Sequence, residues 1–343
     1  MDVEPARQGE VLVGFIANPR SGHDIRRLVA RASVFPNTEK LMMLQRVLTS
    51  LGAVGVHRVA VATDAGGIAS GLADAVEAHR PARDPPWPRV ELLDLPLHGG
   101  AADTVAAADA LVRLGARVLV VLGGDGTDRL VASVCGEVPI VALSTGTNNA
   151  FAQLGEATVS GLAAGLLAAG HLAVGDACRR NKVLVVEHQA RVELALVDVA
   201  TTTSSGVGAR AIWNPSEVTE LFVTFAEPGV VGLSSIAALI RPVGRDEPIG
   251  LHLVLRPGAR QQVLAPIAPG LVREVGVESL EVIRAGDRRR ISGRGVVAVD
   301  GERELEFRDT APTVTLSLAG PWSLDVPRAM AVAARRGLLC RPA

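Results

Sequence analysis

The sequence predicts a two-domain protein: a doubly wound, Rossmann-like parallel sheet followed by an antiparallel β-sandwich. The chain has 343 residues, and domains of about 100–200 residues are usual, so two domains are expected. In the first half, short apolar runs alternate with helical segments, which is typical of parallel strands covered on both faces. In the second half, strand patterns recur between turn residues about every 8–12 residues, which indicates an antiparallel sandwich.

The α/β domain is expected to contain five strands separated by helices. The strands are predicted at residues 11–17, 54–62, 90–95, 117–122 and 139–143, and the helices at 25–32, 39–51, 67–78, 101–114 and 127–134. A proline-rich surface loop is predicted at residues 81–88.

The β-sandwich domain is expected to contain nine strands and one helix. The strands are predicted at 182–187, 191–200, 217–225, 249–255, 262–267, 278–283, 295–299, 305–307 and 313–318, with the helix at 233–240. A terminal helix at 327–339 is expected to pack back on the first domain. The predicted domains are therefore residues 1–170 with 320–343, and residues 171–319.

Composition argues against several classes of partner. The net charge is −1 and aromatic residues make up 3% of the chain, so neither bulk charge nor stacking favours nucleic acid or a membrane surface. Three separated cysteines and an acidic N-terminus without signal-peptide character favour a soluble cytoplasmic protein. The most apolar segment, residues 160–173, is shorter than the roughly 20 residues that span a bilayer.

The stretch RVLVVLGGDGT at residues 117–127 is the strongest chemical signal. A glycine-rich turn after a buried strand lets backbone N–H groups approach phosphate oxygens. The carboxylate of Asp125 in that turn is unsuited to bare phosphate. It fits contact with a metal ion, acceptance of a hydroxyl proton or binding of a sugar hydroxyl. All three indicate phosphoryl transfer or nucleotide chemistry.

Three strand-to-helix loops share this design, and in a doubly wound sheet they meet at the carboxyl edge, where ligands bind. Their candidate phosphate-binding residues are Asn18, Arg20, Ser21 and Gly22, then Gly123, Gly124, Gly126 and Thr127, then Thr145, Gly146, Thr147, Asn148 and Asn149. A purely structural interpretation stays open, because glycine also turns the chain and Ser, Thr and Asn cap helices.

The order NPxSG, GGDGT and GTxN, followed by an all-β domain with a late Asp-Gly pair, resembles the superfamily of NAD kinases and diacylglycerol or sphingoid-base kinases. The resemblance covers most of the chain. The wider sequence around these motifs is most similar to the acetoin catabolism X (AcoX) proteins, an NAD-kinase-like family.

This resemblance implies roles for three aspartates. Asp125 is the candidate general base that acts on the 2′-hydroxyl of the adenosine ribose of NAD. Asp198 is a candidate ligand of ribose hydroxyls. Asp300 is a second catalytic candidate that assists catalysis or metal binding, although an Asp-Gly pair between two strands is also a hairpin turn signal.

The sequence also departs from the kinase patterns. Val197 replaces an asparagine of the NAD kinases, and residues 227–242 keep Pro228, Gly229, Ser235 and Pro242 but lack the Thr, Tyr and Gly-Gly elements. Ala150 stands where the lipid-kinase branch usually has aspartate.

The resulting expectation is an ATP-dependent kinase that uses Mg²⁺ and phosphorylates NAD to NADP, with metal ligands that the sequence does not identify. No P-loop lysine is present, so Mg²⁺, helix N-termini and Arg20 or Arg129 are expected to balance phosphate charge. Two alternatives stay open: a non-catalytic NAD- or ATP-binding accessory protein of acetoin catabolism, and a lipid or sphingoid-base kinase. We also expect a homo-oligomer, a dimer or a tetramer.

Overall fold

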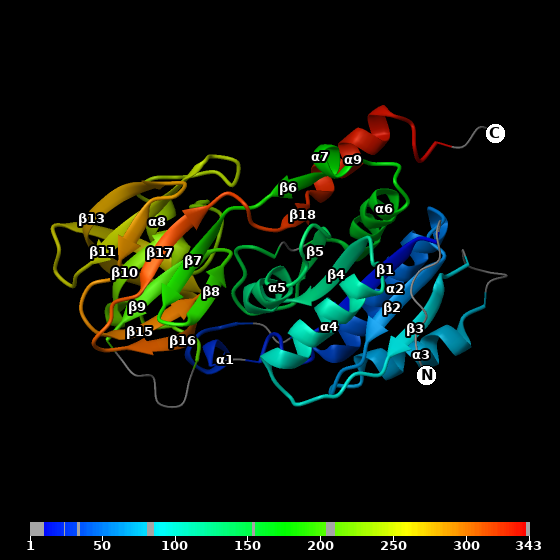
Figure 1. Cartoon of the computed structure of the whole chain (residues 1–343), viewed down its shortest axis with the longest axis horizontal. Helices are drawn as coiled ribbons and strands as arrows, with labels where there is room; N and C mark the ends of the chain where they lie inside the picture. The colour runs from blue at the N-terminus through cyan, green and yellow to red at the C-terminus, as the bar shows by residue number, and fades with distance from the viewer. Residues whose placement is uncertain are drawn as a thin grey trace.

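The computed structural model describes residues 10–23, 25–32, 35–80, 86–152, 155–203 and 210–340. The chain forms an α/β half built on a seven-stranded sheet and a β half built on sheets of seven and four strands (Figure 1). The predicted fold class, a parallel-sheet domain followed by an antiparallel sandwich, is confirmed.

The α/β half has the strand order β3-β2-β1-β4-β5-β18-β6, and its first five strands in this order run parallel. They are β1 (Leu12–Ala17), β2 (Arg58–Ala62), β3 (Arg89–Leu93), β4 (Val118–Gly123) and β5 (Ile140–Ser144). The helices are α1 (Arg26–Val29), α2 (Asn37–Ala53), α3 (Ile68–Ala78), α4 (Ala101–Arg113), α5 (Asp125–Ala132), α6 (Ala157–Ala168) and α7 (Val174–Ala177).

Two apolar cores explain the continuous apolar runs of these strands. Val118 and Val120 of β4 face one core, which contains residues of α2, α3 and α6, whereas Leu119 and Val121 face the other, which contains residues of α4 and α5. Since both faces are covered, neither can be polar. The strand order reverses between β1 and β4, which places the topological switch point there.

The C-terminal segment completes the first sheet. Strand β18 (Trp322–Leu324) lies between β5 and β6 (Cys178–Arg180), parallel to the former and antiparallel to the latter. Helix α9 (Val326–Arg335) buries Ala329, Val332 and Ala333 in the core beneath α6 and α7.

The β half is a sandwich. Its larger sheet has the order β12-β13-β11-β10-β9-β15-β16 and its smaller sheet β14-β17-β7-β8. The strands are β7 (Val183–His188), β8 (Arg191–Ala195), β9 (Asp198–Thr202), β10 (Val218–Val223), β11 (Ile249–Leu255), β12 (Gln261–Ala268), β13 (Leu271–Arg284), β14 (Arg288–Arg290), β15 (Gly295–Val299), β16 (Glu302–Phe307) and β17 (Thr313–Ser317). Leu184 and Leu316 of one sheet share a core with Phe222 and Val297 of the other. A 3-10 turn at Pro215–Glu217 precedes β10. A short helix after β10, α8 (Ser234–Ala238), covers the opposite face of the larger sheet.

Several element boundaries differ from the prediction. The strand predicted at 54–62 begins only at Arg58, because α2 continues to Ala53 and Gly55 turns the chain with a φ of 84°. The strand predicted at 191–200 is divided into β8 and β9, which belong to different sheets. Within the described ranges, no helix combines the length and apolar character needed to cross a membrane.

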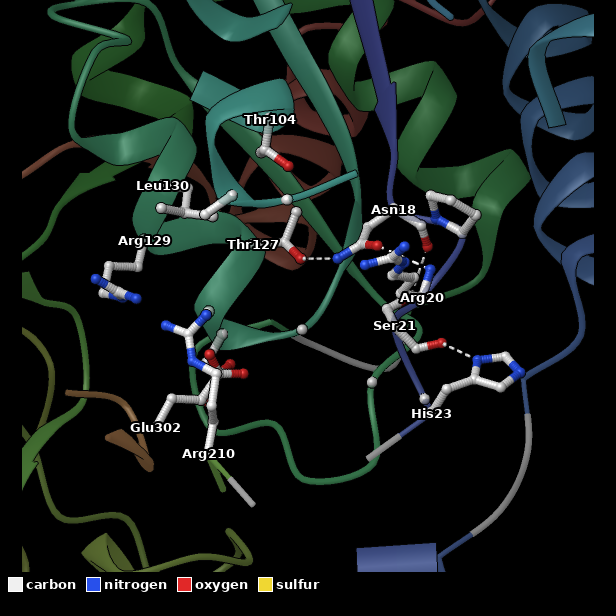
Figure 2. A pocket seen from close by; sticks show the side chains of 18 of the residues that line it. Asn18, Arg20, Ser21, His23, Thr104, Thr127, Arg129, Leu130, Arg210 and Glu302 are labelled. Atoms are coloured by element: carbon white, nitrogen blue, oxygen red, sulfur yellow. Dashed lines mark hydrogen bonds between the residues drawn. The ribbon is translucent and has the colours of Figure 1, made fainter. Parts of the chain in front are cut away.

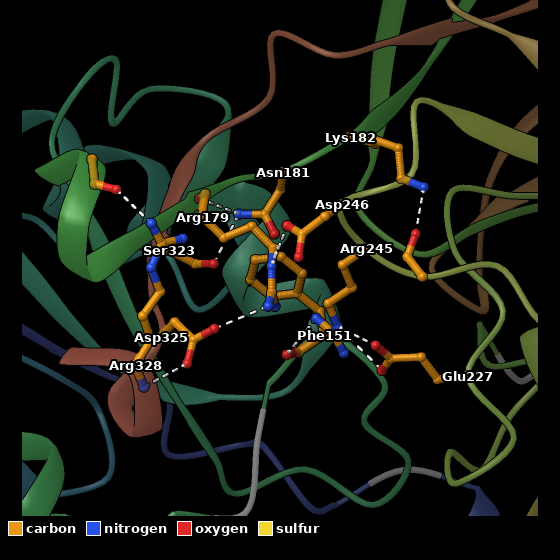
Figure 3. A network of polar contacts seen from close by, with 12 residues as sticks. Phe151, Arg179, Asn181, Lys182, Glu227, Arg245, Asp246, Ser323, Asp325 and Arg328 are labelled. Atoms are coloured by element: carbon orange, nitrogen blue, oxygen red, sulfur yellow. Dashed lines mark hydrogen bonds and ion pairs between the residues drawn. The ribbon is translucent and has the colours of Figure 1, made fainter. Parts of the chain in front are cut away.

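Charged side chains connect the two halves (Figure 3). Arg179 of β6 pairs with Asp246 at 2.8 Å and with Asp325 at 2.9 Å. Arg245 pairs with Glu227 at 3.2 Å and donates to the carbonyl oxygen of Phe151 at 3.4 Å. These contacts join loops of the β half to the end of the parallel sheet.

A candidate nucleotide site between the two halves

A cleft of about 960 Å³ lies at the carboxyl edge of the parallel sheet. The loops that follow all five parallel strands line it, and the β15–β16 hairpin and residues 210–211 of the β half line its other side. Figure 2 shows Asn18, Thr127 and Glu302 around this space. The cleft therefore lies at the switch point, where ligands of doubly wound sheets bind.

Side-chain hydrogen bonds bring the three glycine-containing loops together. The Asn18 amide donates to Thr127 Oγ1 at 2.9 Å, and the hydroxyl groups of Ser21 and Thr145 lie 2.7 Å apart. Most of the candidate residues line the cleft: Asn18, Arg20, Ser21, Gly22, Gly124, Asp125, Gly126, Thr127, Gly146, Thr147, Asn148, Asn149 and Asp300. Gly123, Thr145 and Asp198 do not line it; Gly123 ends β4 and Thr145 is buried behind it.

Two glycines allow close packing in these loops, Gly146 between the second and third loops and Gly123 within the second. A methyl group at Gly146 would lie 3.0 Å from the Cα atom of Gly124 and closer still to the side-chain amide of Asn149. A methyl group at Gly123 would collide with the Thr127 side chain at 2.5 Å. The glycines therefore permit close backbone packing as well as approach to a ligand.

Asp125 begins α5 and joins the second loop to the third. Its Oδ2 atom accepts from the Ala150 amide at 2.7 Å, and its Oδ1 atom accepts from the amides of Phe151 at 2.9 Å and Ala152 at 3.1 Å. Burial raises the pKa of Asp125, while these amides and the charge of Arg245 oppose the increase. A carboxyl held in this way is oriented and is a stronger base than a solvated one.

Asp300 makes a matching set of contacts in the β half. It occupies the β15–β16 turn with a φ of 49°, and its carboxylate accepts from the amides of Leu196 at 3.0 Å, Val197 at 2.8 Å and Asp198 at 3.1 Å. Burial raises its pKa to about 7, although the charge of Arg129 lowers it. Asp300 is thus a turn residue that also lines the cleft.

Two further carboxyl groups lie buried beside this pair. Asp128 is fully buried, and neither of its carboxylate oxygens has a hydrogen-bond partner within the described part of the chain. Burial, Asp125 and Asp300 all raise its pKa. Burial, followed by Asp300 and Asp125, raises the pKa of Asp198 to about 8. Four carboxyl groups therefore lie close together, and two of them, Asp125 and Asp300, line the cleft.

The positive charge behind the first loop comes from a residue that sequence reasoning missed. Lys40 of α2 is fully buried, and its ammonium group donates to the carbonyl oxygens of Asn18 at 2.9 Å, Ser21 at 3.1 Å and Pro19 at 3.3 Å. Burial lowers its pKa to about 8. The sequence signal that could have identified Lys40 was the rarity of lysine, since the chain has only one other lysine.

The two arginines expected to balance phosphate charge are already engaged. Arg20 donates to the carbonyl oxygen of Gly99 at 2.7 Å, and Arg129 pairs with Glu304 at 2.7 Å. Gly99 belongs to the loop between β3 and α4, which sequence reasoning also missed although its His-Gly-Gly follows a strand. Glu302 lines the cleft as well; a methyl group at Gly126 would lie 3.3 Å from its Oε1 atom.

Among the described residues, no group of three or more His, Cys, Asp or Glu side chains is arranged to hold a metal ion. Mg²⁺ in kinase sites is commonly bound by one or two carboxylates together with substrate phosphates. The carboxyl groups that line the cleft fit this mode of binding, in which the ion is held by carboxylates and substrate phosphates together.

The parallel sheet, its glycine loops and the sandwich across the cleft define a protein of the NAD-kinase-like fold. Residues 13–172 match the ATP-NAD kinase N-terminal domain, and residues 182–319 match the acetoin catabolism protein X C-terminal domain. The chain is 41% identical over 337 residues to acetoin catabolism protein X of Cupriavidus necator, covering 96% of this chain and 94% of that protein. It belongs to the acetoin catabolism protein X family.

A solved structure from Bacillus anthracis str. Sterne, described as a candidate diacylglycerol kinase, is also similar. It is 11% identical, with 92% of this chain and 97% of that chain covered, at a TM-score of 0.44.

Proposed function

We propose that this protein transfers a phosphoryl group from ATP, in the presence of Mg²⁺, to a hydroxyl group of a nucleotide, and that NAD is the acceptor and NADP the product. The observation that carries the proposal is the meeting of three glycine loops and two buried carboxyl groups in one cleft at the switch point. Its volume of about 960 Å³ is at the upper end of the range for small-molecule sites.

In this mechanism the loop amides hold the donor phosphates, and the buried ammonium of Lys40 adds positive charge from behind the first loop without touching them. Mg²⁺ would be held by carboxyl groups that line the cleft together with the phosphates, and would neutralise part of the phosphate charge. Asp125 orients the acceptor hydroxyl and takes its proton. The hydroxyl oxygen forms a bond to the γ-phosphorus while the bond from that phosphorus to the β–γ bridging oxygen breaks. Asp300, with a pKa of about 7, is the second carboxyl group able to hold a proton near the reacting atoms.

The family relationships support this assignment. The N-terminal half matches the ATP-NAD kinase domain, and the name of the Cupriavidus necator relative connects that protein with acetoin catabolism. We propose the same metabolic setting for this chain, with homo-oligomeric assembly in the cytoplasm.

A second candidate function is nucleotide binding without turnover. The contacts of Asp125 and Asp300 favour it, because each carboxylate already accepts three backbone amides and so fixes a loop. Such a protein would bind NAD or ATP as an accessory or sensing protein.

The deciding experiment incubates the full chain with Mg²⁺, NAD and either ATP or polyphosphate, and measures NADP. We expect NADP from the wild type and about 10²–10⁴-fold less from Asp125→Asn, because proton removal is lost. Unfolding midpoint and NAD affinity of both proteins provide the control for folding. Tight binding of NAD and ATP by the wild type without NADP formation would reject phosphoryl transfer to NAD and favour the second candidate.

A further inference from the structure

A second, much smaller cavity of about 20 Å³ lies under the floor of the cleft. It is lined from both halves, by Asn148 of the third loop, by Asp198 of β9 and by Ser234 of α8. It shares Arg26, Asp125, Asn148 and Asp300 with the lining of the main cleft. A cavity of roughly 10–15 Å³ is enough for one water molecule, so this cavity accommodates one occupant of that size.

Three polar atoms on this cavity have no hydrogen-bond partner within the described part of the chain. They are Asp198 Oδ1, Asn148 Oδ1 and Ser234 Oγ. Asp198 is only 5% exposed and Ser234 is fully buried. Buried polar atoms without partners cost about 1–3 kcal/mol each, and native proteins rarely leave them so. Three of them on one cavity indicate a bound species.

The chemistry of these atoms favours a cation. All three are oxygens, and the Asn148 amide nitrogen is already directed to the carbonyl oxygen of Ile267 at 3.3 Å. Oxygen-only sets are typical of hard cations. The lining of the cavity also includes the carboxyl groups of Asp125 and Asp300 and the side chain of Arg26.

The size of the cavity distinguishes between cations. Mg²⁺ dehydrates reluctantly and usually keeps several water molecules, for which about 20 Å³ leaves no room. A dehydrated potassium or ammonium ion is about as large as one water molecule and accepts irregular oxygen coordination.

We propose that this cavity is a binding site for a single monovalent cation of the potassium or ammonium class, held by Asn148, Asp198 and Ser234. The ion joins the third loop to β9 and α8, and thus the α/β half to the β half. The site goes beyond the proposed function and exists in the protein without nucleotide, so its test is independent of any phosphoryl transfer.

The test measures thermal unfolding of the full chain in KCl, NH₄Cl, NaCl, MgCl₂ and choline chloride at equal ionic strength. We expect Tm in KCl or NH₄Cl to rise saturably above that in choline chloride, by about 3 °C at ten times the dissociation constant. Crystals soaked in thallium acetate should show an anomalous peak in the cavity, because Tl⁺ replaces K⁺. The KCl and NH₄Cl arms identify which ion binds more tightly.

Two variants and one matched control sharpen the test. Asp198→Asn and Ser234→Ala should remove the potassium-dependent rise, and Ser234→Ala should retain or exceed the wild-type Tm in choline because it removes an unpartnered hydroxyl. Thr201→Val is the control: Thr201 lies on the same strand as Asp198, is equally buried and has an unpartnered hydroxyl, but does not line the cavity. It should keep the full rise.

Three results would overturn the proposal. They are equal Tm values in KCl and choline chloride, which means that the cavity holds water; a rise that persists in both cavity variants; and a larger saturable rise in MgCl₂ that both variants abolish.

Discussion

Lys40 and Lys182 are the only lysines of the chain, and both are buried with their ammonium groups donating to backbone carbonyls. Burial lowers the pKa of each to about 8. No carboxylate pairs with Lys40 within the described residues, and only Lys40 lies behind a loop of the cleft. The two residues therefore form a natural comparison between a structural lysine and one that also supports an anion.

Lys40→Met should weaken binding of ATP or inorganic triphosphate about tenfold, or roughly 1.4 kcal/mol, because the first loop loses the positive charge behind it. Lys182→Met should leave this affinity unchanged. Both variants should lower the free energy of unfolding by about 2–4 kcal/mol, since carbonyls lose charged donors. Calorimetric titration and urea unfolding measure the two effects. Equal losses of affinity in both variants would contradict an anion-supporting role for Lys40.

The raised pKa of Asp198 predicts that the stability of the protein depends on pH. Its pKa is about 8 in the folded protein and close to its ordinary value of 3.8 in the unfolded chain, so the folded state binds more protons between these values. The stabilisation is complete below pH 3.8 and is lost as pH rises through about 8.

The free energy of unfolding in choline-based buffer should therefore fall from pH 5 to pH 8.5, and Asp198→Asn should reduce this slope. The substitution removes the titration without removing a hydrogen bond to the unpartnered Oδ1 atom. Urea unfolding at both pH values measures the slope. An unchanged slope in the variant would show that Asp198 does not titrate in this range.

Residue types and spacing predicted the loops of the site but not their connections. Asp125 was identifiable from GGDGT, yet its bonds to the amides of residues 150–152 require two loops 25 positions apart to meet. The contribution of Lys40 likewise depends on how α2 packs behind the first loop. Such long-range contacts have no local sequence signal.

Helices and strands were predictable wherever one local pattern determined them. Successive side chains of β4 point into two different apolar cores, so the strand is a continuous apolar run that can be recognised in the sequence. Strands β6, β14 and β18 have three residues each and were not predicted, because a stretch so short has no periodicity. The first half of β13 was also missed, since exposed charged residues interrupt its pattern.

At the level of elements, the contact between the second and third loops is testable. Gly146→Ala should force them apart, lower the free energy of unfolding by about 1–3 kcal/mol and reduce ATP affinity by about tenfold. Gly175→Ala in α7 is the matched control, because a methyl group there meets no atom within 4 Å. If Gly146→Ala matches this control in both measurements, the loops do not need their close approach.

The whole molecule depends on the return of the chain to the first sheet. A chain ending at Ala319 loses β18 and α9, and with them the buried Ala329, Val332 and Ala333. We expect the free energy of unfolding to fall by at least about 3 kcal/mol and Tm to fall by about 10 °C. A chain ending at Leu339 should unfold like the full chain. Scanning calorimetry compares the three proteins; unchanged unfolding of the shorter chain would show that β18 and α9 are dispensable.

The pairing of β6 with β18 has a consequence for how the chain is divided between the two halves. The chain leaves the first half after β6 and re-enters it before β18, and the two crossing segments are bonded to each other: Asn181 exchanges backbone hydrogen bonds of 3.0 Å with Gly320 and Pro321. Everything between these segments is one insertion with adjacent ends. The match to the acetoin catabolism protein X C-terminal domain, residues 182–319, coincides with this insertion, and the match to the ATP-NAD kinase N-terminal domain, residues 13–172, ends before it. The β half is thus one continuous insertion between two neighbouring strands of the first sheet.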